Sequence, residues 1–87
     1  MKWQVKIDDK ALKVLSKLDK SAKTRIENFI DQLTDVASPR SIGKALQGDL
    51  KGLWRYRVGD YRLICQIKDS QLIILVVEIG HRKDIYQ

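Results

Sequence analysis

The sequence predicts a two-layer α+β domain, in which two helices pack on one face of a mostly antiparallel four-stranded sheet. Apolar residues alternate at the start of the chain, recur at helical spacing over residues 11–36, and alternate again from residue 53. A two-residue turn at residues 59–60 separates two of the alternating segments. Because neither an amphipathic helix nor a half-buried sheet can bury its apolar side alone, the order β-α-α-β-β-β implies two packed layers.

The first strand is expected over residues 2–8, where apolar and polar side chains alternate strictly. A short helix follows with Asp8 or Asp9 as its N-cap, and a longer helix has Ser21 as its N-cap. The region ends before Pro39, because a helix rarely includes the residue that precedes proline. The apolar helical positions are Ala11, Leu12, Leu15 and Leu18 in the first helix, and Ala22, Ile26, Phe29, Ile30, Leu33 and Val36 in the second.

Residues 38–52 form an irregular connection in this prediction, with a single helical turn at Ala45 and Leu46. From residue 53 onward the period is two, which is typical of strands. The predicted strands are Leu53–Val58, Tyr61–Lys68 and Gln71–Ile79. Their short connections make them antiparallel neighbours.

Composition limits the classes of protein that remain. With 87 residues, the chain is expected to form a single domain over residues 1–87. One cysteine and one histidine argue against an internal disulfide and a multi-cysteine or histidine-rich metal site, so no metal and no cofactor are expected. The longest apolar segment, Leu72–Val77, is far shorter than the ~20 residues of a membrane helix, and the chain begins without a signal-peptide pattern. We therefore expect a cytoplasmic protein with no membrane partner and a net charge of +6.

The predicted hairpin brings arginines together. With residues 59–60 as the turn, Arg57 lies across from Arg62, and Arg55 lies one step away on the same face, opposite the helices. Like charges across a sheet are destabilising. Either the side chains splay into water and pair partly with Asp60, or an anion binds between them. We favour the anion, because the planar guanidinium fork grips phosphate or carboxylate through two hydrogen bonds.

The third predicted strand is expected to border this arginine cluster. With residues 69–70 as a turn, Lys68 lies across from Gln71 and Arg62 lies across from Val77. Core positions on this strand are then Leu72, Ile74 and Val76. Aliphatic side chains would border the arginines, namely Ile64, Ile73, Leu75 and Val77. Cys65 falls on the core face and is read as a small buried hydrophobe.

The C-terminal segment supplies further candidate functional groups. His81, Arg82 and Tyr86 are a proton-transferring group, an anion-binding group and an aromatic ring within six residues. They follow the strand that neighbours Arg62, so they can return over the arginine cluster. Such groups suit RNA binding and cleavage. The alternative is a basic chain end with no specific role.

The hairpin over residues 52–64, the Leu46-Gln47-Gly48 segment before it, and the Gly-His-Arg-x-x-x-Tyr ending at residues 80–86 resemble the RelE/ParE superfamily of bacterial and archaeal toxin–antitoxin toxins. The chain is closer to the RelE branch, because Arg82 and Tyr86 are both present. The resemblance implies a ribosome-dependent endoribonuclease, an mRNA interferase. Its ribose 2′-hydroxyl attacks the adjacent phosphate of the A-site codon.

The resemblance also implies site residues. Catalytic candidates are Arg55, Arg57, Arg62, His81, Arg82 and Tyr86, and substrate-binding candidates are Arg55, Arg57, Arg62, Lys51 and Lys83. The best-known family member has lysines at the positions of Arg55 and Arg57. Because arginine does not lose its proton, His81 is the natural candidate for a general base, with an orienting or merely basic residue as the alternative.

The expected partners are a RelB-like cognate antitoxin, the ribosome and mRNA, and operator DNA indirectly through the antitoxin. Two other functions stay open at this point. The ParE branch shares the fold and inhibits DNA gyrase by binding, without nuclease activity. A general basic nucleic-acid-binding module would bind naked nucleic acid with a steep salt dependence.

Overall fold

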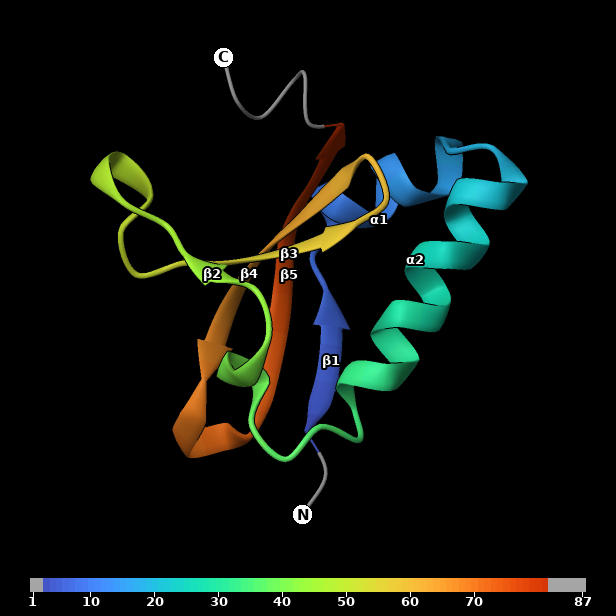
Figure 1. Ribbon diagram of the computed structural model, residues 1–87. Helices are drawn as coiled ribbons and strands as arrows, with labels where there is room; N and C mark the ends of the chain where they lie inside the picture. Colours follow the sequence, from blue (N-terminus) through green and yellow to red (C-terminus); the bar gives the residue numbers. More distant parts are fainter. Residues whose placement is uncertain (1–2, 82–87) are drawn as a thin grey trace.

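The computed structural model describes residues 3–81 and shows the expected two-layer α+β architecture (Figure 1). Its elements are β1 (Gln4–Ile7), α1 (Asp9–Lys17), α2 (Lys20–Leu33), β2 (Lys44–Ala45), β3 (Trp54–Val58), β4 (Tyr61–Lys68) and β5 (Ile73–His81). The strand order in the sheet is β1-β5-β4-β3-β2. β1 runs parallel to β5, and the other neighbours are antiparallel. No helix of the described part is long and apolar enough to cross a membrane.

The helix boundaries differ slightly from the prediction. α1 begins after the N-cap Asp8, as expected. α2 has Asp19 as its N-cap rather than Ser21, because the Asp19 carbonyl already accepts the first helical hydrogen bond, from the Lys23 amide. α2 ends at Leu33 rather than at Val36. Beyond this point the amides bond three residues back, which tightens the last turn and ends the helix.

The core lies between the helices and one face of the sheet, on the face that the alternation predicted. Its fully buried apolar side chains include Ala11, Ile26, Leu33, Tyr56, Leu63, Cys65, Ile74 and Val76. Trp3 also joins this core. Burial raises the pKa of the Cys65 thiol to about 12, which fits a buried hydrophobe and not a nucleophilic thiolate.

The sheet has a fifth strand where the sequence predicted a helical turn at Ala45 and Leu46. Lys44 pairs with Arg55, and Ala45 pairs with Trp54. A two-residue strand has no detectable periodicity, so local pattern could not reveal it. The strand forms because the preceding connection is tied to β3 by side chains that the alternation already placed on the core face.

Three side-chain contacts tie down the connection between α2 and β2. The Tyr56 hydroxyl donates a hydrogen bond to the Pro39 carbonyl, and the Trp54 indole N–H donates one to the Ile42 carbonyl at 2.8 Å. The Arg40 guanidinium binds both carboxylate oxygens of Asp69, at 2.7 and 3.0 Å. Its hydrogen bond lowers the pKa of that carboxyl. These contacts fix the position at which the chain enters β2.

Replacing Gly43 with alanine is expected to lower the free energy of unfolding by about 3 kcal/mol. Gly43 has a φ of +82°, and a Cβ at this position would collide with the Arg55 carbonyl and the Trp54 indole. Gly48→Ala is the matched control, because Gly48 also has positive φ (+66°) but lies in open space, so its cost is about 1 kcal/mol. Urea denaturation measures both. Equal losses would contradict the close approach at Gly43.

The pairing of β4 with β5 differs from the prediction. The connection is longer than two residues, because a 3₁₀ turn (Asp69–Gln71) is followed by Leu72 with φ +54°, so Lys68 pairs with Ile73. This two-residue shift leaves the predicted core positions on the core face. A β-bulge follows, which makes Arg62 pair with Gly80 rather than with Val77.

The bulge changes which side chains of β5 face the helices. Ile64 pairs with Glu78 whereas Cys65 pairs with Val76, so Val77 is the additional residue. Beyond it, the alternation is displaced by one position, and Ile79 is buried in the core.

Candidate nucleic-acid interface

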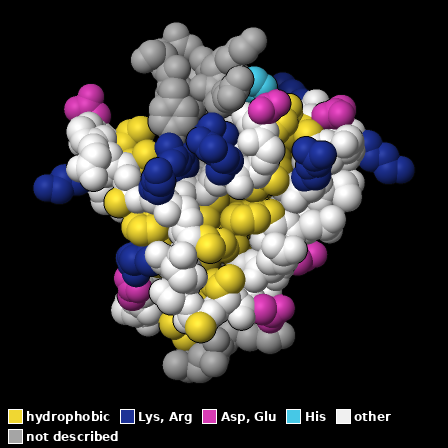
Figure 2. Space-filling model, viewed as in Figure 1, with side chains coloured by type: hydrophobic (Ala, Val, Ile, Leu, Met, Phe, Trp, Pro, Cys, Tyr) yellow, Lys and Arg dark blue, Asp and Glu magenta, His cyan; other side chains and the backbone are white. Residues whose placement is uncertain are grey.

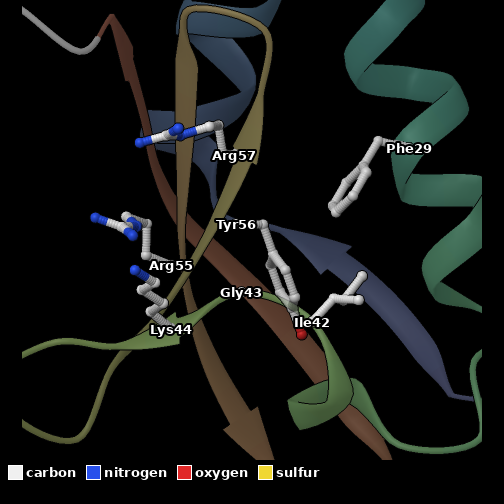
Figure 3. Close-up of a pocket in the computed structure, with 7 residues that line it drawn as sticks. All are labelled: Phe29, Ile42, Gly43, Lys44, Arg55, Tyr56 and Arg57. Carbon is white, nitrogen blue, oxygen red and sulfur yellow. The ribbon is translucent and has the colours of Figure 1, made fainter.

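Four cationic side chains project from the sheet face opposite the helices, which we call the basic face: Lys44, Arg55, Arg57 and Arg62. Arg55 and Arg57 alternate on β3, Lys44 pairs with Arg55 from β2, and Arg62 pairs with Arg57 from β4. Paired residues share a face, so the four project together. Figure 3 shows Lys44, Arg55 and Arg57 pointing to the same side of β3, away from α2.

The turn at Gly59 and Asp60 sets this register. Gly59 has a φ of +59°, and among the described residues Leu72 is the one non-glycine with positive φ, so Asp60 does not share that conformation. This is the pattern of a type II′ turn. Val58 consequently pairs with Tyr61, and Arg57 pairs with Arg62. The predicted hairpin register is confirmed.

The members of the basic face differ in exposure. Arg57 and Lys44 are exposed, Arg55 is half-buried, and Arg62 is only 4% exposed. The Arg62 guanidinium donates a hydrogen bond through Nη1 to the Tyr61 carbonyl at 3.2 Å. A buried, hydrogen-bonded guanidinium has a fixed position, whereas an exposed one can adjust to a ligand.

The basic face concentrates positive charge at an energetic cost. Arg57 lies directly across from Arg62, and Lys44 lies directly across from Arg55. Like charges in such positions destabilise a sheet, and a bound anion removes the repulsion. Arginine forks bind phosphate oxygens through paired hydrogen bonds, so the arrangement suits a phosphate or a chain of phosphates.

The aliphatic border expected beside the arginines is present in part. Ile64, which pairs with Arg55, is only 3% exposed. Leu75 is half-buried and pairs with Gln66, so it keeps the expected face, but Val77 is the bulge residue. Lys44, by contrast, was missed by sequence reasoning. The signal that could have found it is the Gly43-Lys44 step before the hairpin, which marks a chain returning to the sheet edge.

The structure places His81 away from the basic face. His81 pairs with Tyr61, and their rings meet edge to face with centroids 5.5 Å apart. Both line a cavity of about 460 Å³ that also includes Lys10 and Val14 of α1. The bulge causes this placement, because without the additional residue His81 would lie on the same face as Arg62.

The remaining predicted site residues are not brought to the basic face by the described structure. Lys51 is exposed in the connection between β2 and β3, after a 3₁₀ turn at Gly48–Leu50. Arg82, Lys83 and Tyr86 lie outside the described residues. Within residues 3–81, no group of three or more His, Cys, Asp or Glu side chains could hold a metal ion.

The fold and the basic face together define a small α+β protein that can bind a phosphate-containing polyanion. The chain belongs to the ParE toxin family of type II toxin–antitoxin systems, since the model of that family (ParE toxin of type II toxin-antitoxin system, parDE) matches residues 5–86. It is therefore a toxin of such a system, and the resemblance to the RelE/ParE superfamily is confirmed.

Known relatives are of the RelE type. A RelE-like toxin protein of Escherichia coli is 34% identical over 99% of this chain and 92% of its own length. Toxin RelG of Mycobacterium tuberculosis is 37% identical over 56% of each chain. The RelE–RelB complex of Pyrococcus horikoshii is similar with a TM-score of 0.74, 32% identity and coverage of 94% of this chain and 97% of that chain. The RelBE2 toxin–antitoxin complex of M. tuberculosis gives a TM-score of 0.84 and 26% identity over 94% and 100%.

Proposed function

We propose that this toxin is a ribosome-dependent endoribonuclease that cleaves mRNA in the ribosomal A site. The observation that carries the proposal is the basic face, where two arginines lie directly across from each other and two further cations flank them. RelE-like relatives support the choice of RNA over other polyanions.

In the proposed reaction, the ribose 2′-oxygen forms a bond to the adjacent phosphorus, and the bond from phosphorus to the 5′-oxygen breaks. The products are a 2′,3′-cyclic phosphate and a 5′-hydroxyl. Negative charge gathers on the phosphate oxygens in the transition state. Arg57 and Arg62 are assigned to that charge, because groups already placed around it need no reorganisation when it develops. Arg55 and Lys44 bind the flanking phosphates.

Proton transfer needs a group other than the guanidinium groups, because arginine stays protonated. The prediction that His81 is the general base requires its ring to leave Tyr61 and cross the end of β5. Arg82 and Tyr86 keep the roles that the resemblance implies, a phosphate clamp and a platform for a nucleobase. Lys51 and Lys83 stay predicted contacts to the substrate.

Partners follow from the same proposal. The ribosome presents the codon, which suits a basic face that is open rather than enclosed in a deep pocket. We also propose a RelB-like antitoxin that masks the basic face and links the toxin to operator DNA, as structural neighbours of this chain are complexes with RelB. The cytoplasm is the compartment this activity requires.

The test is induced expression with and without the neighbouring open reading frame, followed by mapping of mRNA 5′ ends. New ends inside translated codons, absent when the antitoxin is co-expressed, are the expected result. Because the matching family model is that of ParE, inhibition of DNA gyrase is the second candidate. Loss of supercoiling activity without new mRNA ends would favour gyrase and contradict the nuclease.

A further inference from the structure

The outer edge of β3 is only partly covered. β2 pairs with β3 at Trp54 and Arg55 alone, whereas β3 continues to Val58. In the part of the chain that the structure describes, residues 56–58 therefore carry no strand on their outer side. β2 stops there because the chain turns at Gly43, whose φ is +82°.

A cavity of about 290 Å³ lies along this uncovered edge (Figure 3). Its two sides differ in chemistry. Phe29 and Ile42 form an apolar side, beside the buried ring of Tyr56. Lys44, Arg55 and Arg57 form a cationic side. Figure 2 shows the same division as a band of hydrophobic side chains with Lys and Arg side chains beside it.

Two features make this edge unfavourable in the isolated chain. Ile42 is 42% exposed, although it is a large apolar residue. An uncovered strand edge also presents unpaired peptide groups to any other chain, a feature that proteins usually protect. Together they indicate a surface that a partner covers.

We propose that residues 56–58 accept an extended peptide from a partner protein as an additional strand, with acidic and apolar side chains alternating along that peptide. Side chains of a strand alternate between the two faces of the sheet. Acidic side chains would thus meet Lys44 and Arg57, and apolar ones would meet Phe29 and Ile42. The uncovered edge spans about 10 Å, which fits three or four peptide residues.

Charge and backbone chemistry favour this occupant over two others. A second copy of the chain, paired edge to edge, would bring the same cations of both copies together, which is destabilising. An RNA strand can supply phosphates to the cationic side, but it has no alternating N–H and C=O groups to pair with those of β3. The inference goes beyond the proposed nuclease and does not depend on RNA cleavage.

The experiment uses the full chain and a fluorescein-labelled hexapeptide, Glu-Val-Asp-Val-Glu-Val, with fluorescence anisotropy as the readout. Wild type is expected to bind it, and Ile42→Ser is expected to weaken binding at least about tenfold. Leu12→Ser is the matched control, because Leu12 is 49% exposed on α1, away from this edge, and should change affinity less than about twofold.

Alternate N-methylation of the peptide separates strand pairing from charge attraction. Successive N–H groups of an extended peptide point in opposite directions, so methylating one alternate set should abolish binding and methylating the other should spare it. Hydrogen exchange of the Arg57 amide should slow when the peptide binds. Equal tolerance of both methylated peptides, or no binding by wild type, would overturn the proposal.

Parallel assays keep this inference distinct from the nuclease. Ile42→Ser should retain mRNA cleavage, because Ile42 is not part of the basic face. Wild type that cleaves mRNA but ignores the peptide would overturn only the peptide site. Self-association of wild type that Ile42→Ser abolishes, or RNA rather than peptide binding lost in that variant, would assign the edge to another occupant and overturn it.

Discussion

Replacing Arg57 with alanine is expected to lower the rate of mRNA cleavage on the ribosome by about 100- to 1000-fold, the loss that follows removal of one preorganised charge-stabilising group. Arg57 is exposed on β3 and lies across from Arg62. Its truncation therefore removes a phosphate contact without opening the core. Single-turnover cleavage of a defined mRNA on purified ribosomes measures the effect.

Two further variants control this result. Arg57→Lys keeps the charge but loses the planar fork, so an intermediate rate is expected. Lys13→Ala removes an exposed cation from α1, on the other layer, and should leave the rate unchanged. Cleavage at the wild-type rate by Arg57→Ala would remove the basic face from the mechanism.

Replacing Tyr56 with alanine is expected to cost about 3–5 kcal/mol of unfolding free energy. Tyr56 is completely buried, its ring centroid lies 5.5 Å from that of Phe29, and its hydroxyl bonds the Pro39 carbonyl. A domain of this size has only about 4–13 kcal/mol of stability. A urea denaturation curve should show a protein that is close to unfolded without denaturant.

Tyr56→Phe separates the ring from its hydroxyl. Burial raises the pKa of the Tyr56 hydroxyl well above its ordinary value, so it remains a donor across the physiological range. Removing it leaves the Pro39 carbonyl without this bond, at a cost of about 1–2 kcal/mol. If phenylalanine cost as much as alanine, the hydroxyl rather than the packed ring would hold the α2–β2 connection in place.

Local signals predicted the central hairpin because its turn leaves few alternatives. A glycine at the first turn position fixes the type II′ geometry, and the turn then fixes every pair from Val58 and Tyr61 to Arg55 and Ile64. The helices were predicted equally well, since each needs only an apolar face of helical period. Their ends moved by a few residues because capping depends on individual backbone hydrogen bonds.

The features that sequence did not reveal depend on tertiary contacts. β2 exists because Trp54 and Tyr56 hold the connection that precedes it. The β4–β5 register depends on the left-handed conformation of Leu72 and on one bulge residue. That bulge reverses the faces of the following positions, so the same event buries Ile79 and moves His81 away from the arginines.

The candidate site was consequently predictable only where it rests on the hairpin. Arg55, Arg57 and Arg62 lie together as expected. Lys44 joins them through a strand too short to show a pattern. An exposed lysine on this face restores an ammonium group next to an arginine that stands where the best-known family member has lysine.

The most direct test of the central claim is end analysis of an mRNA held on purified ribosomes and treated with the purified toxin. The account predicts a cut within the A-site codon, with a 2′,3′-cyclic phosphate and a 5′-hydroxyl, and no cut with Arg57→Ala. Intact mRNA on ribosomes treated with a folded toxin that still arrests growth when expressed would contradict it.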